Sequence, residues 1–450
     1  MFASNQTALP PARLARCKLS LSMLALGIGL TFAMPNFTAQ ASDSDPQRIS
    51  AELEQKVIEW RRDIHQNPEL SNREFRTAAL VAEHLQGLGM EVTTEIAHTG
   101  VVGFLRGAHD GPTIALRADM DALPVTERTD VPFASTAVGE YRGEEVGVMH
   151  ACGHDLHVAM LMGAAEHLAS IQDQLHGNVM FIFQPAEEGA PPGEEGGAEL
   201  MLAEGLFDDV TPDAVLGIHV WSAGNTGEIG YRRGPLMASS DRFEIFVKGE
   251  QTHGSRPWGG IDPIVVSSQI VNNVQTIVSR QVDITKAPAV VSFGKIEGGV
   301  RNNIIPDEVY LEGTIRNFDM GIRQQIFDKL TNTAEYTAKA SGATAEVHIH
   351  EGYPVTSNDA ELVDRMLPTT YRIAGENMVY ENELVTGAED FSFFANKVPG
   401  MFVFLGITPP DQDPATAPSN HSPYFYADED ALKVGVELFV NWVIDYAKES

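Results

Sequence analysis

The feature that most constrains the fold of this chain is a repeated alternation of fully apolar runs and helical patterns. Val179–Phe183 and Ala214–Val220 are apolar throughout, whereas segment 155–170 carries small and apolar residues at helical spacing. Apolar runs of this kind are typical of strands buried on both faces of a parallel sheet. The alternation resumes after residue 354 in three further segments: 359–374, 401–406 and 428–448. The sequence therefore predicts an α/β fold, with a mixed, mostly parallel sheet and helices on both faces.

The pattern changes over residues 239–353, where apolar and polar residues alternate within strands. Phe243, Ile245 and Val247 share one face of such a strand, which indicates a sheet with one exposed face. The predicted elements follow the order β-α-β-β-α-β, at 243–247, 262–280, 288–297, 307–316, 319–341 and 345–349. That order is the ferredoxin-like plan. We therefore expect a domain at 239–353 that is inserted into an α/β domain made of residues 42–238 and 354–450.

The beginning of the sequence has the pattern of an export signal. Arg13, Arg16 and Lys18 precede the apolar run Leu19–Met34, and Ala39-Gln40-Ala41 then offers the small residues that a signal peptidase recognises. This order predicts a signal peptide at 1–41, and hence an exported protein of the periplasm or the medium. The alternative is a membrane anchor, but the run is short for a span and no later segment is long and apolar enough for one.

The charge balance narrows the choice of partners. The 450-residue chain carries 62 Asp and Glu residues against 31 Lys and Arg residues, which gives a formal net charge of −31. A chain this acidic repels nucleic acid and anionic membrane surfaces, so we expect neither as a partner. Apolar residues make up 43% of the chain, which is ample for a packed core.

The number of cysteines gives the first indication of a functional residue. Cys17 lies within the expected signal peptide, so Cys152 is the single thiol of the expected mature chain. One thiol cannot form the internal disulfide that is usual in exported proteins. Cys152 is therefore a buried inert thiol, a nucleophile, a metal ligand or an intermolecular bridge. We favour the metal ligand, because coordination protects a thiolate in an oxidising compartment and no cysteine-protease signature surrounds it.

Five segments at or near predicted strand or helix ends carry side chains that bind metals. They are Asp119-Met120-Asp121, residues 152–157, Glu187-Glu188, His219 and Asn420-His421-Ser422. Cysteine, histidine and carboxylates are the ligands that zinc and its neighbours in the first transition series prefer. A lone histidine or a glutamate pair is usually an ordinary polar residue. The combination indicates a metal site in the α/β domain, at the carboxyl ends of its strands.

Five strings of this sequence together resemble a known family. They are Leu116-Arg117-Ala118-Asp119-Met120-Asp121-Ala122-Leu123-Pro124, His150-Ala151-Cys152-Gly153-His154-Asp155, Phe183-Gln184-Pro185-Ala186-Glu187-Glu188-Gly189, Gly387-Ala388-Glu389-Asp390-Phe391 and Asn420-His421-Ser422-Pro423. The strings resemble the M20 metallopeptidase family, in its amidohydrolase branch of hippurate hydrolases, auxin–amino acid conjugate hydrolases and N-acetyl-diaminopimelate deacetylases. The resemblance covers essentially the whole expected mature chain, in order.

The resemblance implies a site for two divalent metal ions, with zinc expected first and manganese, cobalt or nickel as alternatives. Glu187 matches the catalytic base of the family. Cys152 takes the place of a bridging aspartate in the wider family, and Asp119 the place of a histidine ligand. We therefore expect Asp119 and Asp121 to orient histidine ligands rather than to bind metal. The residues that match ligand positions are Cys152, His154, Glu188, His219 and His421.

The resemblance also assigns roles to the inserted domain, as a lid through which the chain forms a homodimer. His253 matches a lid histidine that reaches the active site, in several members from the partner subunit, and would stabilise the tetrahedral intermediate. The alternative for His253 is a surface turn residue. We expect Arg316 to bind substrate, because a guanidinium can hold a carboxylate by two parallel hydrogen bonds, and Asn303 to do so because it matches a lid motif of the family. The alternative for both is an ordinary polar surface residue.

These features together predict a metal-dependent amidohydrolase. We expect it to cleave the amide bond of N-acyl or N-aroyl amino acids into a carboxylic acid and an amino acid, with Glu187 as general base and then general acid. One alternative is a metal-dependent carboxypeptidase or dipeptidase. The other is a non-catalytic exported protein that binds amino acids or peptides.

Overall fold

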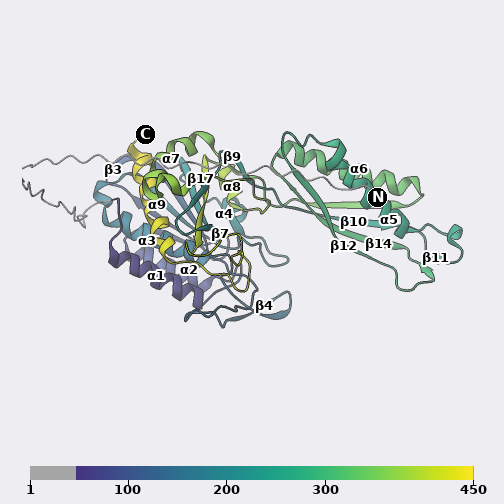
Figure 1. The fold of residues 1–450 in the computed structure, drawn as a ribbon, viewed down its shortest axis with the longest axis horizontal. Coiled ribbons are helices and arrows are strands. Elements are labelled where there is room, and N and C mark those ends of the chain that lie inside the picture. Colours follow the sequence, from purple (N-terminus) through teal and green to yellow (C-terminus); the bar gives the residue numbers. More distant parts are fainter. Residues whose placement is uncertain (1–46, 449–450) are drawn as a thin grey trace, which may run out of the picture. The chain divides into compact units, whose positions relative to one another are not determined.

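The computed structural model describes residues 47–448, and the expected signal peptide at 1–41 lies outside this part. Its largest element is an eight-stranded mixed sheet with the strand order β1-β2-β6-β3-β7-β18-β8-β17 (Figure 1). The four central strands, β6, β3, β7 and β18, run parallel to one another. The strands are β1 (Glu91–Ile96), β2 (Gly100–Arg106), β3 (His109–Asp119), β6 (His176–Gln184), β7 (Ala214–Asn225), β8 (Ile229–Tyr231), β17 (Val379–Glu381) and β18 (Gly400–Thr408).

Helices cover both faces of this sheet because its central strands are apolar on both sides. In β3, Ile114 and Leu116 belong to one apolar core, while Ala115 between them belongs to a second core on the opposite face. The first core is closed by α1 (Ala51–Gln66), α2 (Phe75–Gly87), α3 (His154–Ser170), α7 (Ala360–Ala374) and α9 (Asp430–Lys448). The second is closed by α4 (Gly197–Ala203) and α8 (Phe391–Ala395). The predicted α/β class is confirmed.

Residues 241–350 form a separate four-stranded antiparallel sheet with its own core. The strand order is β12-β14-β10-β15, and two helices cover one face. Along the chain the elements follow the order β-α-β-β-α-β: β10 (Asp241–Lys248), α5 (Pro263–Thr276), β12 (Ala289–Gly298), β14 (Glu308–Asn317), α6 (Met320–Ala340) and β15 (Thr344–His350). We call this part the four-stranded unit. Among the described helices, none combines the length and the apolarity that crossing a membrane requires.

Several short strands have no signal in the sequence. The hairpin of β4 (Val138–Tyr141) and β5 (Glu144–Gly147) turns at Arg142 and Gly143, whose φ angles are 54° and 81°. Two positive φ angles define a tight hairpin turn that usually carries Asn-Gly or Asp-Gly, so an arginine there conceals it. The other short pairs are β9 (Gly234–Met237) with β16 (Thr356–Asn358), and β11 (Thr252–His253) with β13 (Ile304–Ile305).

Candidate active site

The parallel centre of the large sheet brings the predicted ligand segments to one edge. Because β6, β3, β7 and β18 are neighbours that run the same way, their carboxyl ends meet. Asp119 ends β3, Glu187 and Glu188 follow β6, His219 lies in β7, and His421 follows β18. Side chains that are far apart in the sequence are therefore gathered at one place, as expected for a site in an α/β fold.

Gly153 allows its two neighbours in the sequence, both predicted ligands, to approach β7. It precedes α3 with a φ of 96°, and a Cβ atom at this position would lie only 2.3 Å from Val220 Cγ2. A residue with a side chain would therefore both clash and adopt a strained backbone. Its neighbours Cys152 and His154 are consequently held against β7, and Asn420 Nδ2 donates a hydrogen bond of 3.0 Å to the carbonyl of Cys152.

Cys152 lies at the centre of a cluster of ligand atoms that is buried at Cys152, His154 and His219, half-buried at Glu188 and exposed at His421. Its Sγ atom is 3.4 Å from His219 Nε2 and 3.3 Å from His421 Nε2. Two sets of three potential ligands, each with atoms within 4.8 Å of one another, share Cys152: one with His154 and His219, the other with Glu188 and His421. All five predicted ligands are thus brought together, with the thiol where the two sets meet.

The electrostatics of this cluster fit a bound cation. Burial, with Glu188 and Glu187 close by, raises the pKa of the Cys152 thiol well above its usual value. Burial also raises the pKa of Glu187 well above its usual range, with Glu389 and Glu188 adding to the effect. His154 Nε2 is buried without a hydrogen-bond partner. The same nitrogen lies 3.7–4.0 Å from carboxylate oxygens of Asp119, Glu187 and Glu188. Acidic groups crowded around an imidazole nitrogen without a hydrogen bond are the environment that a divalent metal stabilises.

Asp121 and Asp119 hold different partners. Asp121 Oδ1 lies 3.3 Å from His154 Nδ1, so Asp121 orients a predicted ligand. Asp119 Oδ1 instead lies 2.5 Å from Nδ1 of His157. The other nitrogen of that ring, Nε2, accepts a hydrogen bond of 2.8 Å from the backbone of Val220. Both nitrogens of His157, which is not a predicted ligand, are therefore engaged. The other carboxylate oxygen of Asp119 lies 3.7 Å from Nε2 of the predicted ligand His154.

The backbone of segment 186–188, which carries Glu187, is held by hydrogen bonds to three side chains. The sequence analysis did not predict this role for any of them. The three N–H groups of the segment donate to buried carboxylates, the first to Glu74 at 2.9 Å and the next two to Asp121 at 3.1 and 3.0 Å. The hydroxyl of Tyr353 donates to the carbonyl of Glu187 at 2.7 Å. Ala186 has a φ of 52°, a conformation that costs about 1–3 kcal/mol outside glycine. These hydrogen bonds keep the strained segment in place.

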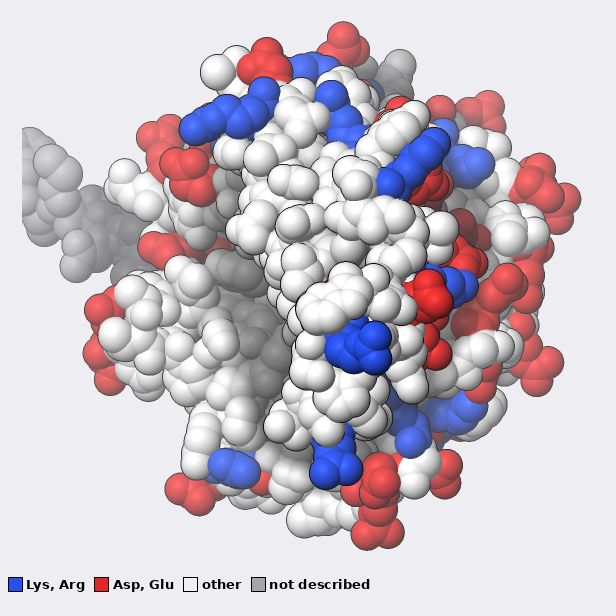
Figure 2. Space-filling model, turned by 90° about the vertical axis from the view of Figure 1, so that its right-hand side faces the viewer, with Lys and Arg blue, Asp and Glu red and all other residues white. Residues whose placement is uncertain are grey.

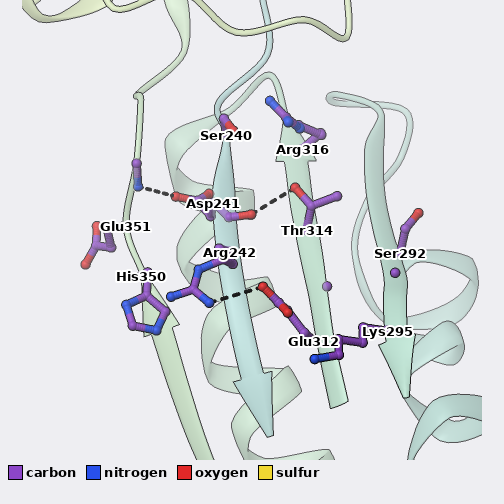
Figure 3. A pocket seen from close by; sticks show the side chains of 13 residues that line it. Ser240, Asp241, Arg242, Ser292, Lys295, Glu312, Thr314, Arg316, His350 and Glu351 are labelled. Atoms are coloured by element: carbon purple, nitrogen blue, oxygen red, sulfur yellow. Dashed lines mark hydrogen bonds and ion pairs between the residues drawn. The ribbon is translucent and has the colours of Figure 1, made fainter. Parts of the chain in front are cut away.

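The cluster opens into a cavity of about 910 Å³, which Arg316 of the four-stranded unit also lines. Figure 3 shows Arg316 on β14, apart from the ion pair that Arg242 and Glu312 form on the open face of the same sheet. Within the part of the chain described here, the guanidinium of Arg316 has neither a hydrogen bond nor an ion pair. Arg316 is therefore a half-buried cation available to an anionic ligand.

The two other predicted residues of the inserted segment are not brought to this cavity. His253 is exposed on β11, and its Nδ1 atom accepts a hydrogen bond of 3.0 Å from the backbone of Ser255. Asn303 is exposed beside it, with its carbonyl 2.9 Å from the N–H of Gly254. In Figure 1, β11 lies at the end of the four-stranded unit that is distant from β7. Neither side chain lines the cavity that contains Cys152.

Comparison with known proteins defines the class. Residues 115–445 match the family model described as "Peptidase family M20/M25/M40". The chain belongs to this family of metal-dependent hydrolases.

The names of its relatives describe enzymes that cleave different kinds of bond. "Thermostable carboxypeptidase 2" of Saccharolobus solfataricus is 45% identical over 85% of this chain and 93% of its own length. "N-acetyl-L-cysteine deacetylase" of Bacillus subtilis is 38% identical over 87% of this chain and 88% of its own. A crystal structure of a "dinuclear metal binding peptidase from M20 family" of Bacillus subtilis superimposes with a TM-score of 0.75, at 34% identity over 89% of this chain and 99% of that one.

Proposed function

We propose that this protein hydrolyses the amide bond of N-acyl or N-aroyl amino acids and releases a carboxylic acid and an amino acid. The observation that carries the proposal is that one cavity is lined by Cys152 with other members of its cluster, by the buried side chain of Glu187 and by the unpaired guanidinium of Arg316. A base beside the cluster suits hydrolysis, and a free cation suits a substrate that bears a carboxylate.

Two divalent metal ions would be held by five side chains, with zinc favoured by the thiolate and imidazoles and manganese, cobalt or nickel as alternatives. When bound, such ions lower the pKa of water and polarise a carbonyl group. Asp121 keeps the ring of His154 in position through its 3.3 Å contact. The proposed ligands are Cys152, His154, Glu188, His219 and His421.

Glu187 is the proposed general base and acid. It is 5% exposed, and its backbone is held by Asp121 and Tyr353. Its carboxylate takes the proton of the attacking water and delivers it to the nitrogen of the leaving amino acid. Arg316 binds the α-carboxylate of that amino acid by two parallel hydrogen bonds and thereby aligns the amide beside Glu187.

A substrate panel tests this proposal. Hippurate and acetyl-amino acids are expected to be hydrolysed with higher kcat/KM than dipeptides, and their α-carboxamide derivatives to be poor substrates because they lack the anion for Arg316. The 45% identical carboxypeptidase relative makes peptide hydrolysis the second candidate, and faster cleavage of dipeptides would favour it. If the metal-loaded protein hydrolyses none of these compounds, a binding protein without catalysis becomes the better account.

We further propose a homodimer in which His253 serves the partner's active site. The four-stranded unit exposes Trp258, Val300 and Ile296 at 77, 91 and 61% of their surfaces. Figure 2, seen from the side on which β11 lies in Figure 1, shows a face with few charged residues at its centre. Exposed apolar surface of this kind is typical of an interface.

His253→Ala is expected to lower kcat on the order of 10²–10³-fold, because a donor to the tetrahedral intermediate is lost. If His253 acts across the dimer, subunit exchange between His253→Ala and an inactive Glu187→Gln variant should restore about a quarter of the wild-type activity, since half of the dimers then contain one intact site. No recovery in dimers that have demonstrably exchanged would contradict action in trans, and an unchanged kcat of His253→Ala would contradict any role.

Tyr353→Phe is expected to lower kcat about 3- to 10-fold with little change in KM, because one hydrogen bond to the Glu187 carbonyl is worth about 0.5–1.5 kcal/mol. Steady-state kinetics with metal analysis check this result. Tyr310→Phe is the matched control, since its hydroxyl donates at 2.7 Å to Glu244 on the four-stranded unit, away from the cluster. Equal kinetics of the two variants would exclude the positioning role.

Export of the protein remains our proposal, resting on the pattern of residues 1–41. Expression of the full chain in a bacterium followed by N-terminal sequencing tests it, with cleavage after Ala41 as the expected result.

A further inference from the structure

A second, more enclosed cavity adjoins the cluster at Glu188. Its volume is about 370 Å³, and Glu188 lines both this cavity and the larger one. None of its lining residues belongs to the four-stranded unit, whereas Arg316 and Val290 of that unit line the larger cavity. The two cavities therefore share Glu188 and are otherwise lined by different residues, with Arg316 at the larger one only.

The walls of the smaller cavity come from four segments of the α/β part. The loop before α2 and the segment after β3 contribute Leu70 and Leu123, and the loop after β6 contributes Pro191 and Pro192. The turn of the β4–β5 hairpin closes the remaining side with Tyr141. These side chains are apolar or aromatic, so they favour an apolar ligand over water.

The charged groups at this cavity do not provide a strong anion site. Arg73 is engaged by Glu194, with nitrogen–oxygen distances of 3.0 and 2.5 Å. Arg142 is exposed on the hairpin turn, with its guanidinium 5.2 Å from the ring of Tyr141, and the acidic residue Glu140 of the same hairpin also lines the cavity. The free, half-buried cation lies instead in the larger cavity, at Arg316.

An N-acyl amino acid has two parts, one on each side of the carbonyl group that is attacked. If Arg316 holds the carboxylate of the amino acid, the carbonyl lies beside Glu187 and Glu188, and the acyl group points away from Arg316. The other cavity that Glu188 lines is the smaller one, and Arg316 does not line it. A volume of about 370 Å³ leaves room for a benzoyl group or a medium-length alkyl chain and is far larger than an acetyl group needs.

We propose that this smaller cavity binds the acyl group of the substrate and makes the enzyme selective for aromatic and medium-length aliphatic acyl groups over acetyl. The inference rests on the proposed function and adds the substrate class. Each methylene that enters an apolar cavity raises kcat/KM about fourfold, which corresponds to the transfer of one CH₂ group from water. The β4–β5 hairpin and the loop after β6 are then the elements that set acyl specificity.

A series of acyl groups on one amino acid tests the proposal. We expect kcat/KM of the wild-type enzyme to rise from N-acetyl through N-butanoyl to N-hexanoyl, and N-benzoyl to exceed N-acetyl on the order of 100-fold. Pro191→Trp, on the exposed loop, fills the cavity and should lower kcat/KM for hexanoyl and benzoyl substrates at least about tenfold, while acetyl changes less than about twofold.

Two variants make the result specific. Pro192→Trp fills the cavity from the next position of the same loop and should have the same selective effect. Ser292→Trp is the matched control, because it adds the same indole ring to an exposed strand residue that lies on the open face of the four-stranded sheet and lines neither the smaller nor the larger cavity. Ser292→Trp should leave the ratio of benzoyl to acetyl hydrolysis unchanged.

The possible failures are distinguishable. If the wild-type enzyme hydrolyses no acyl-amino acid, the proposed function itself fails. If it hydrolyses them but prefers acetyl, the assignment of the cavity is overturned while the function stands. A loss in Pro191→Trp and Pro192→Trp that is equal for all acyl groups, in variants with wild-type melting temperature and metal content, also overturns the assignment.

Discussion

Cys152→Ser is expected to lose bound metal and hydrolytic activity together. The Sγ atom lies between the two sets of ligand atoms, 3.4 Å from His219 Nε2 and 3.3 Å from His421 Nε2. A serine hydroxyl is a much weaker ligand than a thiolate, so both sets lose affinity at once. The loss of even a supporting contact typically lowers metal affinity 10–100-fold, and we expect the loss of this shared ligand to cost at least on the order of 10²-fold. Metal analysis after gel filtration, with kinetics on the same sample, measures both effects.

Cys152→Asp is the informative companion variant. A carboxylate can bridge two ions, so this variant should retain part of the metal and part of the activity that Cys152→Ser loses. If Cys152→Ser instead keeps its full metal content and loses activity, the thiol acts as a nucleophile and the ligand assignment is wrong.

Glu187→Gln is expected to lower kcat on the order of 10²–10⁴-fold while the metal content stays at the wild-type level. The amide keeps the shape of the side chain and the backbone contacts to Asp121 and Tyr353, but it cannot take a proton from water. Since hydrolysis requires that proton transfer, binding of substrate should be preserved and turnover should not.

The adjacent Glu188→Gln variant is the control for this experiment. Glu188 shares a set of ligand atoms with Cys152 and His421, so its replacement should reduce metal content as well as activity. Two neighbouring glutamates with opposite effects on metal binding would separate the base from the ligand. Loss of metal in Glu187→Gln, or a kcat within about threefold of wild type, would contradict the role of Glu187.

The long strands could be predicted because a strand buried on both faces has an apolar sequence. Val179–Phe183 and Ala214–Val220 are apolar on both sides since helices cover both faces of β6 and β7. The short strands β8, β9, β16 and β17 are three or four residues long, too short for such a pattern, and exist through pairing with distant segments. The β4–β5 hairpin, with Glu140, Glu144 and Glu145, resembles a solvated loop in sequence.

The residues of the candidate site also fall into two groups, those that could be identified from the sequence and those that could not. Cys152, His154, Glu187, Glu188, His219 and His421 were identifiable because their residue types bind metals or move protons and recur at ends of predicted elements. Tyr353 and Glu74 are common residues without any motif, and they touch the 186–188 segment from 166 and 112 positions away in the sequence. No local pattern records a contact over such a separation.

The sequence by itself determined the α/β class, the chemical types of the ligands and the family to which they point, because periodicity and residue chemistry are properties of the chain alone. Only the tertiary structure decided that Cys152 lies where two sets of ligands meet, that Asp119 is hydrogen-bonded to His157, and that Arg316 is unpaired while His253 lies away from the cavity. It also decided that the β4–β5 hairpin, which has no signal in the sequence, lines the smaller cavity together with Glu188. These facts depend on which strands and loops from distant parts of the sequence lie side by side. Only the packing of the whole chain sets the distances between their side chains.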